Sequence, residues 1–249
     1  MATPSRATVV PADHARKPVD GTASGAGLQA VLWDMDGTIV DTEPYWIQAE
    51  SELVAAHGGT WTQEQAEGLV GQALTFSARV LQSAGVQLSV RDIIDTLTEE
   101  VTAKVRQSVP WRPGARELLQ DLRERGIPCA LVTMSEQMLA REVERQLPEG
   151  TFTLMVTGDM VEHGKPNPEA YLLAFEKMSE VSRLEKDRVI AIEDSIPGVT
   201  AARAAGLVTL GVPHFVPLPP DSANHEWGTL AGRSAEDLAE LIPSAGGQP

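Results

Sequence analysis

Five short apolar runs that alternate with helical patterns constrain the fold of this 249-residue chain more than any other feature. A strand that is apolar at nearly every position has both faces buried, as in parallel sheets that are covered by helices. The sequence therefore predicts an α/β fold around a parallel sheet. The apolar runs are AVLWD (30–34), CALVT (129–133), TLMVTG (153–158), VIAIED (189–194) and VTLGV (208–212), and the helical patterns span 114–126, 135–147, 167–179 and 196–206.

One interval breaks this alternation. Residues 44–110 contain helical patterns such as YWIQAESELVAAHGG and VRDIIDTLTEEVTAKVRQ but no strand pattern, and they are too many for a simple crossover. We expect an α-helical domain at 44–110, inserted into a Rossmann-like core made of residues 28–43 and 111–243. Residues 1–27 are rich in Pro, Ala, Gly and Ser and lack the apolar centre of a signal peptide, which predicts a disordered tail on a cytoplasmic protein.

The charge of the chain excludes several classes of partner. A formal net charge of −15 leaves no basic excess with which to bind the phosphate backbone of a nucleic acid or an anionic membrane surface. No segment approaches the run of about 20 apolar residues that a membrane-spanning helix requires. The single cysteine, Cys129, excludes an intramolecular disulfide and a cysteine-rich zinc site. We expect a monomer that acts on a small molecule.

Polar side chains follow four of the predicted strands at the point where each strand ends. In an open parallel sheet, ligands bind beyond the carboxyl ends of the strands, so these four segments should meet at one edge. Together they would bring carboxylates, hydroxyls and a lysine to a single site. The residues are Asp34 and Asp36, then Thr133 and Ser135, then Gly158 and Asp159 followed by HGKPNP with Lys165, and finally Glu193 and Asp194.

This set of side chains suits phosphoryl transfer. Several carboxylates without cysteine or clustered histidine favour Mg²⁺ over zinc. Lys165 and the hydroxyl of Thr133 can bind a phosphoryl group that Asp34 attacks as the nucleophile. Asp36, on the same face of the extended chain, can act as general acid and then as general base, and Gly37 allows an immediate turn.

The same residues resemble the haloacid dehalogenase-like phosphohydrolases. DMDGT looks like the first motif of that family, LVT ending at Thr133 its second, GKPNP with Lys165 its third, and EDS its fourth. The resemblance covers residues 30 to 213, and the order of the motifs is typical of the branch with a helical cap between the first two.

The resemblance implies a role for each matching residue. Asp34 is expected to be the nucleophile and a metal ligand, and Asp36 the acid/base that also offers its backbone carbonyl to Mg²⁺. Phosphate binding is expected from Thr133, Lys165 and Gly37. The fourth motif supplies two further metal ligands, Asp194 and Glu193, the latter directly or through water.

The cap is expected to select the substrate. The segment VGQALTFSAR (70–79) offers Gln72, Thr75 and Arg79 as polar groups, and Trp46 lies just past the hinge DTE. These four residues are the candidates for contact with the part of the substrate that is not phosphate.

Two alternatives remain besides a phosphatase for sugar or polyol phosphates. A hexose phosphomutase would use the same core, but mutases of this branch commonly have a histidine where this chain has Trp46 and an arginine near Leu74. Without those basic groups, transfer of the phosphoryl group to water is favoured. A non-catalytic binding protein would have no need of Asp36.

Overall fold

The computed structural model describes residues 27–243. Its centre is a six-stranded sheet in which every neighbouring pair is parallel, in the order β3-β2-β1-β4-β5-β6. This confirms the α/β class and the five predicted strands. The predicted tail at 1–27 lies outside the described residues except for Gly27. The strands are β1 (Ala30–Trp33), β2 (Cys129–Val132), β3 (Leu154–Val156), β4 (Val189–Glu193), β5 (Val208–Gly211) and β6 (His225–Glu226).

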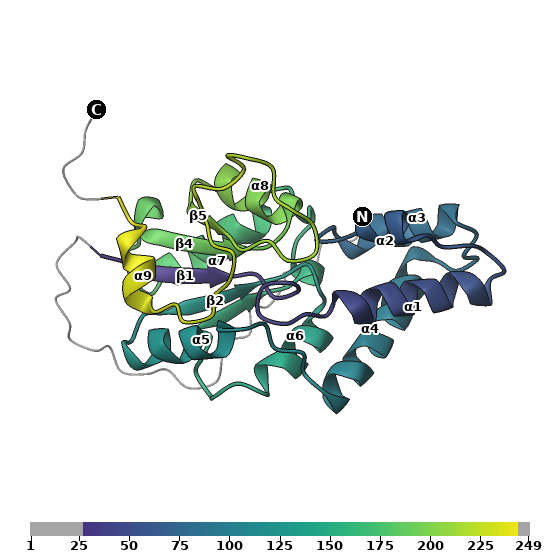
Figure 1. The fold of residues 1–249 in the computed structure, drawn as a ribbon, viewed down its shortest axis with the longest axis horizontal. Coiled ribbons are helices and arrows are strands. Elements are labelled where there is room, and N and C mark those ends of the chain that lie inside the picture. The colour runs from purple at the N-terminus through teal and green to yellow at the C-terminus, as the bar shows by residue number, and fades with distance from the viewer. Residues whose placement is uncertain (1–26, 244–249) are drawn as a thin grey trace, which may run out of the picture.

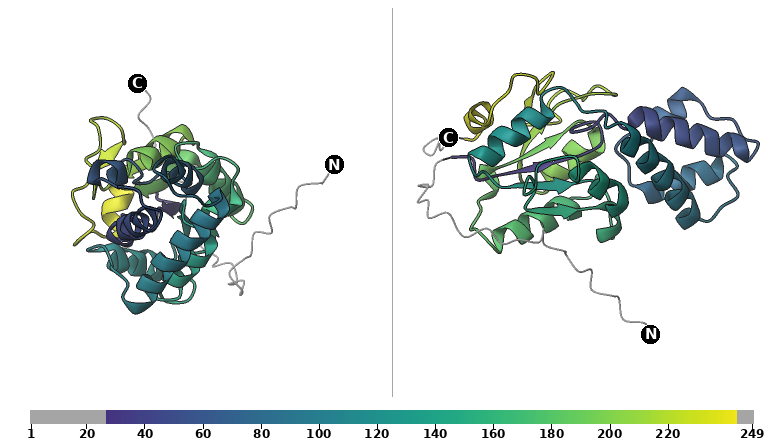
Figure 2. Two further views of the ribbon diagram at one scale, coloured as in Figure 1. Left: turned by 90° about the vertical axis from the view of Figure 1, so that its right-hand side faces the viewer. Right: turned by 90° about the horizontal axis from the view of Figure 1, so that it is seen from below.

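Helices cover both faces of the sheet (Figures 1 and 2). Successive side chains of a strand point to opposite faces, so Val31 and Trp33 enter one apolar cluster while Ala30 and Leu32 enter another. Helices α5, α6 and α9 contribute to the first cluster, and α7 and α8 to the second. Their bounds are α5 (Ala115–Glu124), α6 (Gln137–Glu144), α7 (Glu169–Ser179), α8 (Ile196–Ala204) and α9 (Ala235–Glu240), with 3-10 turns at Gly158–Met160 and Lys186–Arg188.

Of the five helices between β1 and β2 in the chain, the first four lie beyond the carboxyl ends of the strands (Figure 1). The longest, α4, packs against α1 and α3 through an apolar face that includes Ile93, Leu97 and Val101. The side chains of Thr62 and Ser89 cap the first turns of α2 and α4. This helical set matches the predicted insertion, whose division into a separate domain at 44–110 stays a prediction. The helices are α1 (Glu43–Ala56), α2 (Gln63–Glu67), α3 (Leu74–Ser83) and α4 (Val90–Gln107).

The chain enters and leaves the helical set through two adjacent segments. Asp41 N donates to Pro110 O at 2.7 Å, and Arg112 N donates to Ile39 O at 2.9 Å. Two short backbone connections side by side give a narrow hinge between the sheet and the helices. Within residues 27–243, no helix combines the length and apolar character needed to span a membrane.

Candidate active site

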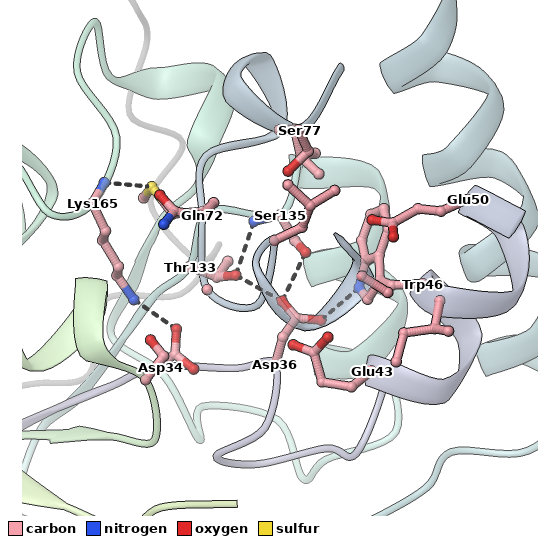
Figure 3. A pocket seen from close by; sticks show the side chains of 17 residues that line it. Asp34, Asp36, Glu43, Trp46, Glu50, Gln72, Ser77, Thr133, Ser135 and Lys165 are labelled. Atoms are coloured by element: carbon pink, nitrogen blue, oxygen red, sulfur yellow. Dashed lines mark hydrogen bonds and ion pairs between the residues drawn. The ribbon is translucent and has the colours of Figure 1, made fainter. Parts of the chain in front are cut away.

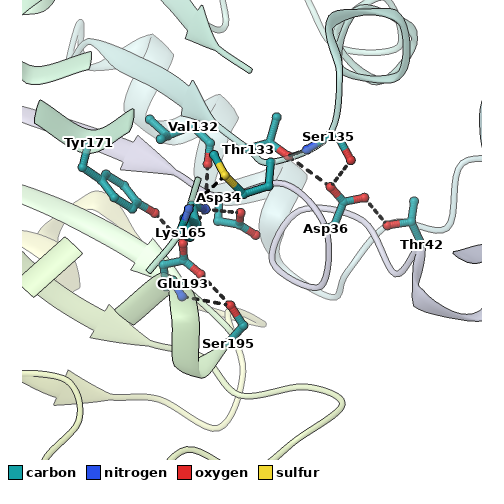
Figure 4. A network of polar contacts seen from close by, with 12 residues as sticks. Asp34, Asp36, Thr42, Val132, Thr133, Ser135, Lys165, Tyr171, Glu193 and Ser195 are labelled. Carbon is teal, nitrogen blue, oxygen red and sulfur yellow. Dashed lines mark hydrogen bonds and ion pairs between the residues drawn. The ribbon is translucent and has the colours of Figure 1, made fainter. Parts of the chain in front are cut away.

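The carboxyl ends of β1, β2 and β4 meet at one edge of the sheet, as the sequence predicts. Strand β1 lies between β2 and β4, so the residues after it face both neighbours. Asp34, Thr133 and Asp194 follow these strands directly, and all three are buried. Figure 4 shows that Lys165, from the loop before α7, reaches into the same group. Residues from segments that are far apart in the chain therefore form one site.

Lys165 holds two carboxylates together. Its Nζ lies 2.6 Å from Asp34 Oδ1 and 2.6 Å from Glu193 Oε1, and it donates to Val132 O at 2.9 Å. Burial alone would lower the pKa of Lys165, but the negative charges of Asp34 and Glu193 raise it above its ordinary value. The hydroxyl of Tyr171 also donates to Glu193 Oε1, at 2.6 Å. A fully charged lysine is thus fixed beside the predicted nucleophile.

Asp34 keeps one oxygen free. Its Oδ1 binds Lys165, whereas Oδ2 is buried and has no hydrogen-bond partner among residues 27–243. Burial, followed by the charge of Glu193, raises the pKa of Asp34 to about 8 in spite of Lys165. An unpartnered buried carboxylate oxygen is costly unless a ligand completes it. Oδ2 of Asp34 is therefore suited to bind a cation or an electrophilic atom of a ligand.

The residues present fit a hard cation at this point. Asp34, Glu193 and Asp194 each offer a carboxylate oxygen, and these oxygens all lie within 4.8 Å of one another. Burial, followed by the charge of Asp34, raises the pKa of Asp194, and a bound cation would reverse that effect. Gly37 adopts φ +85°, and a Cβ at this position would overlap the carboxylate of Asp194. Gly37 therefore allows the loop to pack tightly against the acidic cluster.

Asp36 is held by four donors and its side chain lies apart from the acidic cluster. Its Oδ1 accepts hydrogen bonds from the hydroxyl of Thr42 and, at 3.3 Å, from Trp46 Nε1. Its Oδ2 accepts from the hydroxyls of Thr133 at 3.1 Å and Ser135 at 2.7 Å. These contacts fix the orientation of the side chain; its acid/base role and metal binding by its backbone carbonyl stay predictions. Thr133, predicted to bind phosphate, points its hydroxyl at this carboxylate.

A cavity lies between the edge of the sheet and the helical set (Figure 3). Of the four predicted cap contacts, Trp46 and Gln72 line it, but Thr75 and Arg79 do not. The inward face of α3 carries Leu74 and Ser77, one helical turn apart, which turns Thr75 and Arg79 to solvent. Thr75 and Arg79 therefore lie outside this cavity, and their predicted contact with substrate has no support from the described structure.

Two buried glutamates in the cavity wall were not predicted as substrate-facing residues. Glu43 and Glu50 lie on α1, seven residues apart, with Trp46 and Ile47 between them on the same helical face. Burial, followed by the charge of Asp36, raises the pKa of Glu43 to about 8, and burial raises that of Glu50 to about 7. The sequence did contain a signal for this placement, because Glu43 and Glu50 fall on the same helical face as the apolar Trp46 and Ile47.

Burying Glu50 should make the stability of the protein depend on pH. Its pKa rises from 4.5 to about 7 on folding. The contribution of protonated Glu50 to the free energy of unfolding is therefore fully present below pH 4.5 and is lost as the pH rises through 7. Glu50→Gln, which has no proton to lose, is expected to be more stable than the wild type at pH 8 by up to about 3 kcal/mol.

Urea unfolding in the presence of chelator at pH 5 and pH 8 measures this difference. Glu52→Gln is the matched control, because Glu52 is exposed on the same helix. A Glu50→Gln effect that is equal at both pH values would contradict the assignment.

Comparison with known proteins agrees with this geometry. A family model for haloacid dehalogenase-like hydrolases matches residues 31–212. The chain is 33% identical over 221 residues to the phosphorylated carbohydrates phosphatase of Thermotoga maritima, an alignment covering 86% of this chain and 98% of that protein. It is 30% identical over 207 residues to the N-acetylmuramic acid 6-phosphate phosphatase of Pseudomonas aeruginosa, covering 81% and 88%.

Solved structures show the same architecture. CbbY from Rhodobacter sphaeroides, in complex with xylulose 1,5-bisphosphate, superposes with a TM-score of 0.75 at 26% identity, covering 85% of this chain and 99% of that one. The β-phosphoglucomutase of Clostridium difficile shares the fold, with a TM-score of 0.72 at 20% identity over 86% of this chain and 97% of that one. The chain therefore belongs to the haloacid dehalogenase-like hydrolases, as one of their phosphatases.

Proposed function

We propose that this phosphatase hydrolyses the monoester of a small sugar or polyol phosphate through a phosphorylated Asp34, with Mg²⁺ as its cofactor. The observation that carries the proposal is the state of the Asp34 carboxylate. Lys165 fixes Oδ1, while Oδ2, in the wall of the cavity, has no hydrogen-bond partner in the described part of the chain. Similarity to phosphatases that are named for phosphorylated carbohydrates, hexitols and N-acetylmuramic acid 6-phosphate supports the substrate class.

In the first step, a carboxylate oxygen of Asp34 forms a bond to phosphorus and the ester bond to the leaving oxygen breaks. Asp36 lies on the cap side of Asp34 in Figure 3, and it gives its proton to that oxygen. Lys165, with the hydroxyl of Thr133 and the turn at Gly37, would bind the phosphoryl oxygens. The product alcohol then leaves the cavity.

In the second step, water attacks the phosphorus of the phosphorylated Asp34. Asp36, now ionised, accepts the proton of that water, and the bond between phosphorus and Asp34 breaks. Inorganic phosphate leaves, and both aspartates return to their starting states. Mg²⁺ bound by Asp34, Asp194 and Glu193 would neutralise the charge of the phosphoryl group.

Removal of the metal is expected to stop turnover. Without a cation, Lys165 is the counter-charge of Asp34 and Glu193, and Asp194 adds a third carboxylate, which leaves an excess of negative charge facing the phosphate. We expect excess chelator to abolish phosphate release from a panel of phosphorylated metabolites, added Mg²⁺ to restore it, and Ca²⁺ to inhibit because of its looser coordination. Full activity in excess chelator would contradict the cofactor assignment.

The phosphomutase alternative is tested separately. This chain shares its fold with a β-phosphoglucomutase. In this chain, however, Trp46 and not a basic residue forms the wall of the cavity beside Asp36. Incubation with β-glucose 1-phosphate, primed by glucose 1,6-bisphosphate, should release phosphate without isomerised sugar. Glucose 6-phosphate that forms much faster than inorganic phosphate would identify a mutase. A cytoplasmic location and a monomeric state stay predictions.

A further inference from the structure

The cavity wall that faces the catalytic aspartates is acidic. Glu43 and Glu50 occupy the first and last positions of a two-turn stripe on α1, and Trp46 and Ile47 fill the space between them. Figure 3 shows Glu50 and Glu43 on the cap side of the cavity, with Glu43 beside Asp36 and Glu50 beside Trp46. A substrate whose phosphate is bound at Asp34 must therefore place its other end against this stripe.

Neither glutamate has a cation beside it within residues 27–243. Glu50 is only 5% exposed, and the indole of Trp61 is the donor beside it; its Oε2 makes no well-aligned hydrogen bond among residues 27–243. The side chain of Glu43 is 6% exposed and, within the same described residues, is surrounded by other carboxylates and has no ion-pair partner. Of the described residues that line the cavity, Lys165 alone carries a positive charge, and it is bound to Asp34 and Glu193 on the opposite side. The cap wall thus offers hydrogen-bond acceptors and no cation.

We propose that this wall selects monophosphates with a hydroxylated leaving group and rejects bisphosphates, with Glu50 as a specificity-determining residue. The inference rests on the proposed phosphatase function and narrows its substrate class. Hydroxyl groups of the leaving group would donate to the carboxylates of Glu50 and Glu43, and the indole of Trp46 would pack against the carbon skeleton.

A second phosphate has no favourable position against the cap wall. It would lose its hydration and meet Glu50 and Glu43 where a cation would be required. Like charges placed together in a desolvated site reduce binding strongly, by at least about a hundredfold. This chain would then differ from CbbY, whose solved structure holds a bisphosphorylated sugar.

The test compares glucose 6-phosphate with glucose 1,6-bisphosphate as competitors of p-nitrophenyl phosphate hydrolysis. At pH 8, above the pKa of about 7 that burial gives Glu50, the inhibition constant of the bisphosphate is expected to exceed that of the monophosphate by at least about a hundredfold. Glu50→Gln should reduce this ratio by about tenfold or more, since it removes the charge and keeps the size. Glu52→Gln, exposed on the same helix, should leave the ratio unchanged.

The outcomes separate this inference from the proposed function. Equal or tighter inhibition by the bisphosphate, or a ratio unchanged in Glu50→Gln, would overturn the inference while p-nitrophenyl phosphate is still hydrolysed. Absence of inhibition by both sugars would overturn the hydroxylated substrate class. Failure of the wild type to release phosphate from any monoester would instead contradict the proposed function. Hydrolysis of p-nitrophenyl phosphate by Glu50→Gln shows that the variant is folded.

Discussion

Replacing Asp34 with asparagine is expected to abolish phosphatase turnover, by at least about a thousandfold, without unfolding the protein. An amide cannot attack phosphorus as a carboxylate does, and its size is unchanged. Lys165 keeps its contact with Glu193 when the charge of Asp34 is lost. Burial disfavours the charge of Asp34 and raises its pKa to about 8. Removing that charge is therefore not expected to destabilise the fold.

Phosphate release in the presence of Mg²⁺, together with thermal unfolding of the same preparations, measures this effect. Asp187→Asn is the matched control, because Asp187 is exposed in the 3-10 turn before β4 and is outside the cavity. Substantial activity in purified Asp34→Asn, beyond what a trace of wild-type enzyme could supply, would show that another residue is the nucleophile.

The position of the core residues could be predicted because it follows from topology. Parallel strands end at a common edge, so the polar residues after AVLW, CALV and VIAI had to meet once the sheet was inferred. The family resemblance then gave each residue an expected role. Strand β6, His225–Glu226, escaped prediction because a two-residue edge strand has no apolar period to detect.

The cap side could be predicted only in part, since no comparable rule says which face of a helix covers a site. Trp46 and Gln72 reach the cavity, whereas Thr75 and Arg79 follow the outer face of α3. That face is set by how α3 packs on α4, a tertiary contact that a single sequence does not specify. Glu50 was not predicted to face the cavity because an acidic residue in a helix usually faces solvent.

The network around Asp36 also needed the structure. Thr42 and Trp46 reach one oxygen from the start of α1, and Thr133 and Ser135 reach the other from the end of β2. The acid/base therefore lies at the joint between sheet and helices, so a change in the angle of α1 would move two of its four donors. Its orientation is linked to the hinge through which the cap would close over the substrate.

Replacing Asp36 with asparagine is expected to trap the phosphorylated enzyme. Asparagine can keep hydrogen bonds to Thr133 and Ser135 through its carbonyl, so the fold is preserved, and with it the first attack on a substrate whose leaving group needs no proton. It can neither give a proton to the leaving oxygen nor accept one from water. The steady-state rate should fall by about a hundredfold to ten-thousandfold, the usual contribution of a general acid or base.

The leaving group decides where the Asp36→Asn reaction stops. Nitrophenolate leaves without a proton, so p-nitrophenyl phosphate should still phosphorylate Asp34 and give a burst of nitrophenolate, after which hydrolysis is slow. A sugar phosphate, whose alkoxide needs the proton, should give no burst. Intact mass spectrometry of acid-quenched protein should detect the phosphorylated chain only with p-nitrophenyl phosphate. The Asp34→Asn/Asp36→Asn double variant should show neither burst nor phosphorylation. A burst-free Asp36→Asn enzyme that turns over both substrates at the wild-type rate would remove Asp36 from the mechanism, because each half of the reaction would then proceed without its carboxylate.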